Sequence, residues 1–549
     1  MKRKILFLNL IIIFVLSLSS CNITKNIIND NEKGQPKEET KTEEKPWLSL
    51  KTVKGTEFKY NITEDEFNNF SAEMERAKKY VEAEDHYEYF IDIYNKAKKY
   101  YDEAVKASDA LYLDYCLYGD LDYLDGYEAF DNIKIDILKW FNEVEHLAFN
   151  NSFKNRLWDN KTDDEILELI GTPLPEEYYN LSKELTSYQN DYYELDSSSY
   201  DYLEKVDKLY VSYVNASNKL SKYLNYDNYM DYMYEDTFLR DYKPSDTGDF
   251  FKYCINYLGN YYLPLIENRG NGSYELNSSE KKILNNFFDG NCFEENNFKA
   301  IENYKDSFGG IIKEAFENLF KENGYYFISY EKDGDDGAFQ DTFDGIPYVF
   351  YGAYSHDYLT VIHEFGHYTY ALKGLNYDIF DLCETHSQGN EFMFLNYYMN
   401  NNNFSDNLKE ALMNRMLYNY IRIIVIASLV NEVEKNCYGS NDFKIGDLKK
   451  ELTDIYNEYP LLKKIISFNG ALDYIVEVTI DSPCYYISYA TSAIGALNLN
   501  KIASEDYNKA KECYLKLIKH DGYDEYLDIY EYAGLYNPFN EETFKYLIN

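Results

Sequence analysis

The sequence predicts a mainly α-helical protein, and three observations indicate this fold class. Apolar residues recur at alternating spacings of three and four over residues 67–81, and aromatic residues show similar periodicity through residues 87–240 and 405–460. The chain contains only 10 prolines, so few positions interrupt long helices. Strand character is limited to about residues 325–330 and 348–351. We therefore expect long packed helices with one small β-sheet.

The length of the chain predicts one large folded unit. Residues 47–549, which begin at Trp47, contain no internal repeat and no proline-rich linker. A segment of this size can bury a large hydrophobic core. We expect a single helical unit, with its functional core at about residues 325–505.

The N-terminus has the features of an export signal. Basic residues 2–4 precede an apolar stretch at residues 6–18, which is too short and wrongly flanked to span a membrane. The sequence Leu-Ser-Ser-Cys that ends at Cys21 resembles a bacterial lipobox, so residues 1–20 are expected to be a lipoprotein signal peptide. Residues 21–46 are polar and charged, which is typical of a disordered tether. We expect an exported protein that is anchored at the extracytoplasmic face of the membrane through lipidated Cys21; an uncleaved anchor and ordinary secretion are the alternatives.

The charge of the chain argues against two classes of ligand. The sequence has 95 acidic and 55 basic residues, and its formal net charge is −40. Such an acidic body repels nucleic acid and anionic membrane surfaces. We therefore expect no nucleic-acid partner, and no membrane contact except through the lipid on Cys21.

His363-Glu364-Phe365-Gly366-His367 is the most informative motif in the chain. The surrounding sequence predicts a helix over residues 357–372, in which positions four apart lie on the same face. Both imidazoles can then bind one Zn²⁺ ion, with Glu364 beside it as the general base. The motif indicates metal-assisted hydrolysis, most often of a peptide bond. The alternative is a pair of histidines on an ordinary buried helix face.

A catalytic zinc needs a third protein ligand and one open position, and Glu384 is the best candidate for that ligand. It lies in a second predicted helix that continues through Tyr398, where Glu384, Gln388 and Glu391 share a face. Glu391 is suited to accept the second ring N–H of a ligating histidine. His386 is the alternative third ligand, but it lies about 200° around the helix from Glu384, so both cannot face one ion.

Several segments of the chain are similar to a known family of enzymes. They are Gly337-Ala338-Phe339, Pro347–Phe350, Tyr358–His367, Glu384–Gln388, Pro483–Ala490 and Ala533-Gly534-Leu535. Together they resemble the oligoendopeptidase F and thimet oligopeptidase family of zinc peptidases. The resemblance covers about residues 330–545 motif by motif, and the earlier residues only in helical character and length.

This resemblance implies a large two-lobed helical peptidase, with a deep central channel and a small antiparallel β-sheet next to the zinc helix. An edge strand near residues 348–352 would pair with the backbone of the substrate. The family pattern implies the zinc ligands His363, His367 and Glu384, and Glu364 as the base. It also implies that Tyr486 or Tyr489 stabilises the oxyanion, for which simple packing is the alternative role.

The leading functional hypothesis is a zinc-dependent endopeptidase that hydrolyses short peptides. The alternatives are an exopeptidase on the same zinc core, either a carboxypeptidase or a dipeptidase, and a non-catalytic peptide-binding lipoprotein. Family members often have a histidine where this chain has Pro483, which is the only feature that favours the non-catalytic alternative. The complete set of candidate ligands and base argues against that alternative. The sequence does not indicate an oligomeric state.

Overall fold

The computed structural model describes residues 58–193, 195–270, 274–322, 325–329, 337–372, 379–440, 442–519 and 525–549. The signal peptide predicted for residues 1–20, Cys21, the tether predicted for residues 21–46 and Trp47 lie outside the described residues. These predictions therefore remain untested.

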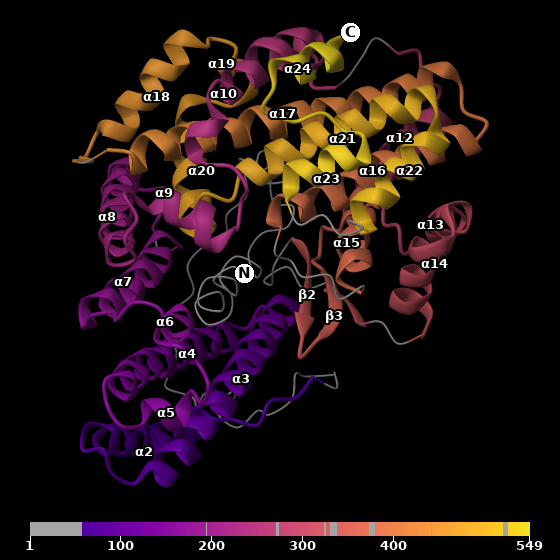
Figure 1. The fold of residues 1–549 in the computed structure, drawn as a ribbon. Coiled ribbons are helices and arrows are strands. Elements are labelled where there is room, and N and C mark those ends of the chain that lie inside the picture. The colour runs from indigo at the N-terminus through magenta and orange to yellow at the C-terminus, as the bar shows by residue number, and fades with distance from the viewer. Residues whose placement is uncertain are drawn as a thin grey trace.

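The described helices form two lobes that have separate hydrophobic cores (Figure 1). The smaller lobe lies at the bottom of Figure 1 in indigo and purple, and its core is built mainly by the three long helices α2 to α4. A capping box of Thr63 and Glu66 begins α2, and Gly119 in a left-handed conformation ends α3. The elements in this part of the chain are α2 (Glu64–Glu82), α3 (Tyr87–Tyr118), α4 (Leu121–Phe149), α5 (Lys154–Leu157) and α6 (Asp163–Ile170).

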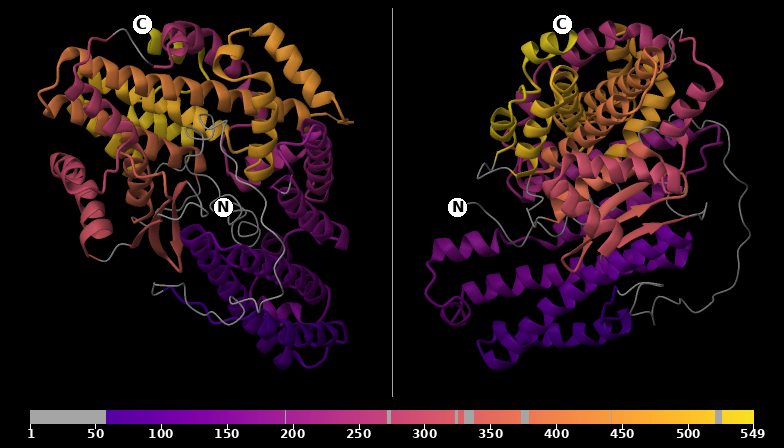
Figure 2. Two further views of the ribbon diagram at one scale, coloured as in Figure 1. Left: turned by 180° about the vertical axis from the view of Figure 1, so that it is seen from behind. Right: turned by 90° about the vertical axis from the view of Figure 1, so that its right-hand side faces the viewer.

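The larger lobe contains the remaining helices and confirms the mainly helical fold class. Its centre is formed by α16, α17 and α21, which lie side by side in the views of Figures 1 and 2. Its helices are α7 (Glu176–Tyr193), α8 (Tyr202–Tyr223), α9 (Tyr229–Tyr232), the π-helix η2 (Met233–Thr237), the 3-10 helix η3 (Pro244–Thr247), α10 (Phe250–Tyr253), the π-helix η4 (Cys254–Gly259), α11 (Leu263–Glu267), α12 (Ser278–Asp289), α13 (Glu295–Phe308), α14 (Gly310–Glu317), the π-helix η5 (Asn318–Glu322), α15 (Tyr358–Ala371), α16 (Phe380–Asn401), α17 (Asp406–Tyr438), α18 (Asp447–Glu458), α19 (Leu462–Ile465), α20 (Phe468–Asp481), α21 (Ile487–Glu505), α22 (Tyr507–Lys519), α23 (Tyr526–Ala533) and α24 (Glu541–Ile548).

A β-sheet lies between the two lobes (Figure 2). Among the described residues it has the strands β1 (Tyr325–Ile328), β2 (Ala338–Phe343) and β3 (Ile346–Tyr351), in the order β1-β3-β2. Phe339 and Phe350 on one face belong to the core of the smaller lobe, whereas Val349 and Tyr351 on the other face belong to the core of the larger lobe. The sheet therefore joins the two cores.

Two details of the predicted sheet are wrong. The sheet is mixed rather than antiparallel, because β1 runs parallel to β3 while β2 runs antiparallel to it. The segment predicted to be an edge strand, residues 348–352, contains most of β3, which is the central strand. The reason is that β3 pairs with β2 through a tight turn at Asp344 and Gly345 and also with β1 on its other side. The two strands with a free edge in the described sheet are β1 and β2.

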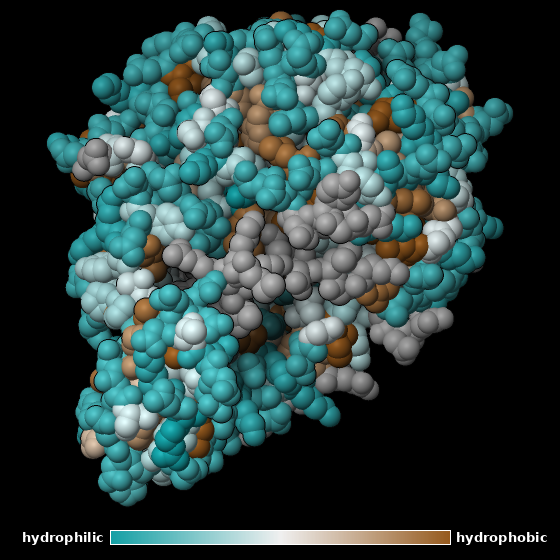
Figure 3. Space-filling model, viewed as in Figure 1, coloured by the Kyte–Doolittle hydropathy of each residue, from teal (hydrophilic) through white to brown (hydrophobic). Residues whose placement is uncertain are grey.

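Helix α17 is the one helix in the described part of the chain that is long and apolar enough to cross a membrane. Its most apolar 18-residue window has a mean hydropathy of 1.3, and 67% of that window is buried inside the protein. Apart from the grey atoms, the face shown in Figure 3 is largely hydrophilic, with hydrophobic areas scattered among the hydrophilic ones. These features are typical of the core helix of a globular domain.

Candidate metal centre

The predicted metal-binding residues lie on two helices that are in close contact. Asp357 caps α15 by accepting hydrogen bonds from the backbone N–H groups of Leu359 and Thr360. Gly366 faces the backbone of α16, and a Cβ atom at this position would lie 2.8 Å from the Cα atom of Ser387. The absence of a side chain at Gly366 therefore lets the two helices approach closely.

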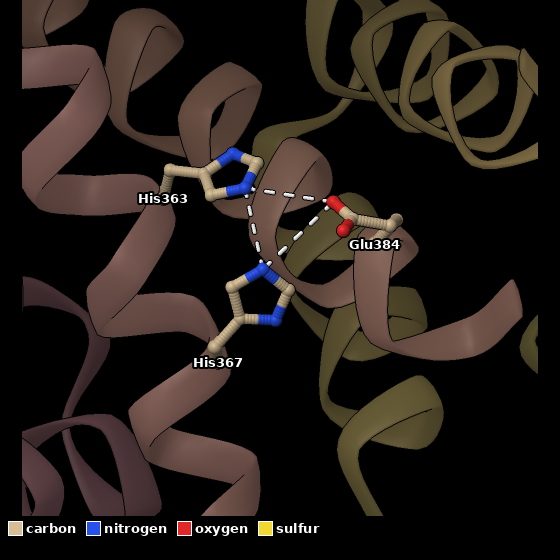
Figure 4. A group of neighbouring side chains, drawn as sticks. All are labelled: His363, His367 and Glu384. Atoms are coloured by element: carbon tan, nitrogen blue, oxygen red, sulfur yellow. Dashed lines mark hydrogen bonds and ion pairs between the residues drawn. The ribbon is translucent and has the colours of Figure 1, made fainter. Parts of the chain in front are cut away.

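The structure brings His363, His367 and Glu384 together (Figure 4). The Nε2 atoms of the two histidines are 3.2 Å apart, and the Oε2 atom of Glu384 lies 3.5 Å from His363 Nε2 and 3.8 Å from His367 Nε2. Ligand atoms about 2.0–2.1 Å from a tetrahedral zinc are about 3.3–3.4 Å apart, so these separations fit such an ion closely. Two neutral imidazoles and one carboxylate are also the donors that zinc prefers.

Neighbouring side chains hold two of these groups in place. Glu391, which is on the face of α16 predicted from the sequence, has its Oε1 atom 2.7 Å from Nδ1 of His363. An N–H donated at Nδ1 leaves Nε2 of His363 as the unprotonated nitrogen, as metal binding requires. The hydroxyl of Tyr485 donates a hydrogen bond of 2.8 Å to Oε1 of Glu384, which leaves Oε2 directed at the histidines.

The electrostatics of the site favour a neutral histidine next to an ionised Glu384. Burial, with a smaller contribution from the charge of His363, lowers the pKa of His367 to about 4. Although burial alone favours a neutral acid, hydrogen bonding to His363 and electrostatic attraction to the two imidazole rings hold the pKa of Glu384 below its usual value. A neutral imidazole and a carboxylate are the forms that bind a metal ion.

Glu364 lies beside this group and is fully buried. Neither of its carboxylate oxygens has a hydrogen-bond partner in the described part of the chain. Burial raises its pKa to about 8, and the negative charges of Glu384 and Glu391 act in the same direction. The backbone of Gln340 on β2 is close enough to Glu364 to oppose this shift. A buried acid without a partner is costly, so its position has the character of a functional site.

The alternative ligand His386 is directed away from the metal centre. Its Nε2 atom lies 3.1 Å from the backbone carbonyl of Leu517 on α22, and its ring packs against Tyr370 with a centroid distance of 4.4 Å. This is the result of the rotation around α16 that separates it from Glu384. Of the two candidates for third ligand, the structure places only Glu384 beside both histidines.

The two tyrosines predicted to be catalytic lie in a cluster of aromatic rings. The ring of Tyr489 is 5.4 Å from that of Tyr486 and 5.3 Å from that of Tyr485, and Tyr486 also packs against Tyr474 at 5.9 Å. In this cluster, Tyr485 is the residue whose hydroxyl group donates a hydrogen bond to a candidate metal ligand, Glu384. No local pattern in the sequence distinguishes Tyr485 from its neighbours, so this contact could not be predicted. The oxyanion role of Tyr486 or Tyr489 stays a prediction.

Comparison with solved structures identifies the fold. A protein from Bacillus anthracis described as an oligoendopeptidase F matches with a TM-score of 0.59 and 14% sequence identity, over 91% of this chain and 97% of that one. The chain has the oligoendopeptidase F fold. PZ peptidase A, solved with an inhibitor, matches with a TM-score of 0.58 and 15% identity over 90% of this chain and 97% of its own. A protein from Chlamydophila abortus described as a peptidase gives a TM-score of 0.54 and 12% identity over 88% and 95% of the two chains.

Sequence comparison alone does not find these relatives. No family model and no curated protein matches the sequence. The oligoendopeptidase F fold is thus shared over almost the whole chain while few residues are identical, so the resemblance drawn from short motifs is supported at the level of the fold.

Proposed function

We propose that this chain is a zinc-dependent endopeptidase that hydrolyses short peptides. The observation that supports this most directly is the buried group of His363, His367 and Glu384, next to the unpartnered carboxylate of Glu364. The fold supports it independently, because the solved structures with the same fold carry descriptions as peptidases. By the same proposal the protein is exported and is held at the membrane by lipid on Cys21.

The residues around the site have distinct roles in this reaction. A zinc ion bound there would lower the pKa of a water nucleophile to about 7 and polarise the scissile carbonyl. The positive charge of such an ion would also lower the pKa of Glu364 from the raised value that burial gives it, so that its carboxylate could accept a proton from the water and pass it to the leaving amine. Glu391 and Tyr485 hold His363 and Glu384 in the orientation that the site requires. Tyr486 or Tyr489 donates a hydrogen bond to the developing oxyanion.

A peptide would be held in the site by backbone pairing with β2. Addition of an extended peptide to a sheet edge is a common mode of peptide recognition. In the described sheet β2 has a free edge, and its residue Gln340 lies close to Glu364. This strand replaces β3 as the one proposed to bind substrate.

The proposal is tested by digesting a peptide library with the purified protein, with and without a chelator. We expect chelator-sensitive cleavage, and cleavage of peptides blocked at both ends would separate an endopeptidase from an exopeptidase. Glu364→Gln should retain zinc, because it removes no ligand, and should lose turnover by at least about 1000-fold. Full activity of Glu364→Gln, or a wild-type protein that takes up no divalent metal, would refute the proposal.

A further inference from the structure

Arg240 is a buried arginine that connects three segments of the larger lobe. It follows the π-helix η2, and its side chain and that of Asp381 are each only 1% exposed. The Nε atom of Arg240 donates to both carboxylate oxygens of Asp381, at 3.2 and 3.3 Å. Its Nη1 atom donates to the backbone carbonyl of Cys484, and its Nη2 atom donates to the hydroxyl of Ser488, both at 2.9 Å.

These three partners lie close in the chain to residues of the metal centre. Asp381 lies in the first turn of α16, three residues before the metal-ligand candidate Glu384. Cys484 directly precedes Tyr485 in the chain, and Ser488 follows three residues after it. Tyr485 is the residue that donates a hydrogen bond to Glu384. The guanidinium group therefore holds the start of the helix that carries Glu384 against the segment that carries Tyr485.

The backbone at Cys484 has an uncommon conformation that neighbouring side chains must stabilise. Its φ angle is +62°, a left-handed conformation that residues other than glycine adopt rarely. The N–H of Cys484 donates to Oε1 of Glu434 at 2.9 Å, and its carbonyl accepts from Arg240. The side chains of Arg240 and Glu434, both buried, thus hold an uncommon backbone conformation immediately before Tyr485.

We propose that Arg240 is a positioning residue, which fixes the segment 484–488 relative to α16 so that the hydroxyl of Tyr485 stays on Glu384. This inference rests on the proposed function. An arginine suits this role because its planar guanidinium presents five donors in a rigid fork on three separate nitrogens, whereas a lysine has three rotatable donors on a single nitrogen. The aromatic rings of Tyr234 and Phe238 lie 4.2 and 4.5 Å from the guanidinium carbon and help to keep it in place.

The test compares Arg240→Gln and Arg240→Lys with a matched control, Arg415→Gln. Arg415 also pairs with an aspartate, Asp289, and also lies over an aromatic ring, that of Phe288, but it has no contact with the site. We would measure the zinc content, kcat and KM of each protein, and the visible absorption spectrum of its Co²⁺-substituted form. The spectrum is included because it reports the geometry of the metal ligands without requiring turnover.

We expect Arg240→Gln to bind one metal ion, to lose about 100-fold in kcat with a much smaller change in KM, and to show an altered cobalt spectrum. Arg240→Lys retains the positive charge opposite Asp381, so it should recover thermal stability while kcat stays at least about tenfold below that of the wild type. The Arg415→Gln variant should match the wild type in kcat and in the cobalt spectrum.

A purely structural role for Arg240 predicts a different result. Arg240→Gln would then melt at a lower temperature but, well below that temperature, would have the kcat and cobalt spectrum of the wild type, which would overturn the inference. If Arg240→Gln does not fold, Ser488→Ala tests the same network. It removes one acceptor of Arg240 together with the hydrogen bond that Ser488 donates to Asp381, and it keeps the pair between Arg240 and Asp381. An unchanged kcat and spectrum in that variant would also overturn the inference. The proposed function fails separately if the wild type shows no chelator-sensitive hydrolysis. In that case the cobalt spectra still test whether Arg240 positions the segment 484–488 relative to α16.

Discussion

Glu384 is held by protein groups at both of its carboxylate oxygens. Tyr485 donates to Oε1, while Oε2 faces the Nε2 atoms of the two histidines and accepts a weaker hydrogen bond of 3.3 Å from Ser387. Groups that orient a metal ligand in this way contribute to metal affinity although they do not touch the ion. At the scale of single residues, Tyr485 is therefore the tyrosine whose loss should affect the metal most.

We predict that Tyr485→Phe lowers the affinity for zinc about 10- to 100-fold. The change removes the hydrogen bond to Glu384 and keeps the packing of the ring. Affinity is measured by competition with a chelator of known strength. The matched control is Tyr486→Phe, a neighbour in the same cluster that packs against Tyr474 and Tyr489. Equal zinc affinity in the wild type and both variants would contradict the orienting role of Tyr485.

The sequence predicts the principal site residues better than it predicts their supporting contacts. His363 and His367 are one helical turn apart, and Glu384 and Glu391 share a helix face, so their positions follow from local spacing. The contact between Tyr485 and Glu384 joins residues 101 positions apart in the chain. It also depends on the left-handed backbone at Cys484, which no sequence pattern indicates. Long-range contacts of this kind require the folded structure.

At the scale of elements, the distance between α15 and α16 determines whether the three proposed metal ligands can meet. A Cβ atom on Gly366 would lie 2.8 Å from Ser387 Cα and 2.9 Å from the carbonyl oxygen of His386, both backbone atoms of α16. Backbone atoms cannot rotate away as the end of a side chain can. A side chain at residue 366 must therefore push the two helices apart.

We predict that Gly366→Ala destabilises the protein and weakens zinc binding. Overpacking costs about 1–3 kcal/mol, which outweighs the gain of about 1 kcal/mol from replacing a helical glycine. The same shift would increase the distances from Glu384 to both histidines. Thermal melting with and without zinc, together with chelator competition, measures both effects.

Gly389→Ala on α16 is the matched control for this prediction. A Cβ atom there would lie 2.9 Å from Cδ1 of Leu499, the end of a side chain that can shift. We expect a smaller loss of stability and an unchanged zinc affinity. If Gly366→Ala bound zinc as tightly as Gly389→Ala, close approach of the two helices would not be what assembles the site.

Helices and strands differed in how far the sequence could predict them. The helix expected at residues 357–372 is observed as α15 at Tyr358–Ala371, because its cap and apolar positions are local signals. In contrast, β2 was missed, since Gln340, Asp341 and Thr342 interrupt any apolar alternation. The strand order was also missed, although the buried run Tyr348–Tyr351 is typical of a central strand.

At the scale of the whole molecule, a pair of carboxyl groups lies where the sheet meets the smaller lobe. Asp341 of β2 is on the same face as Phe339 and interacts with Asp109 of α3. Burial raises the pKa of Asp341 to about 7, although hydrogen bonds from Thr342 and Tyr348 oppose the shift. Burial and the charge of Asp341 also raise the pKa of Asp109 well above its usual value.

These shifts predict that the junction loses stability as the pH rises. The carboxyl of Asp341 titrates near pH 7 in the folded protein and near its ordinary value of 3.8 in the unfolded chain. Between these values the folded state binds more protons, so the free energy of unfolding falls as the pH rises and levels off above about pH 7. Lys134 and Asp131 also act on Asp109, in opposite directions, and do not change this sign.

Asp341→Asn should remove part of this dependence. Asparagine has nearly the same size and still accepts the hydrogen bond from the Thr342 N–H, but it does not ionise. Relative to the wild type, the variant should gain about 1 kcal/mol or more in stability between pH 5 and pH 8, measured as the difference between the two proteins at each pH. Comparing the proteins at each pH cancels the titration of the metal ligands, which they share. A difference that stays constant from pH 5 to pH 8 would show that the carboxyl of Asp341 is already ionised at pH 5, which would contradict the prediction.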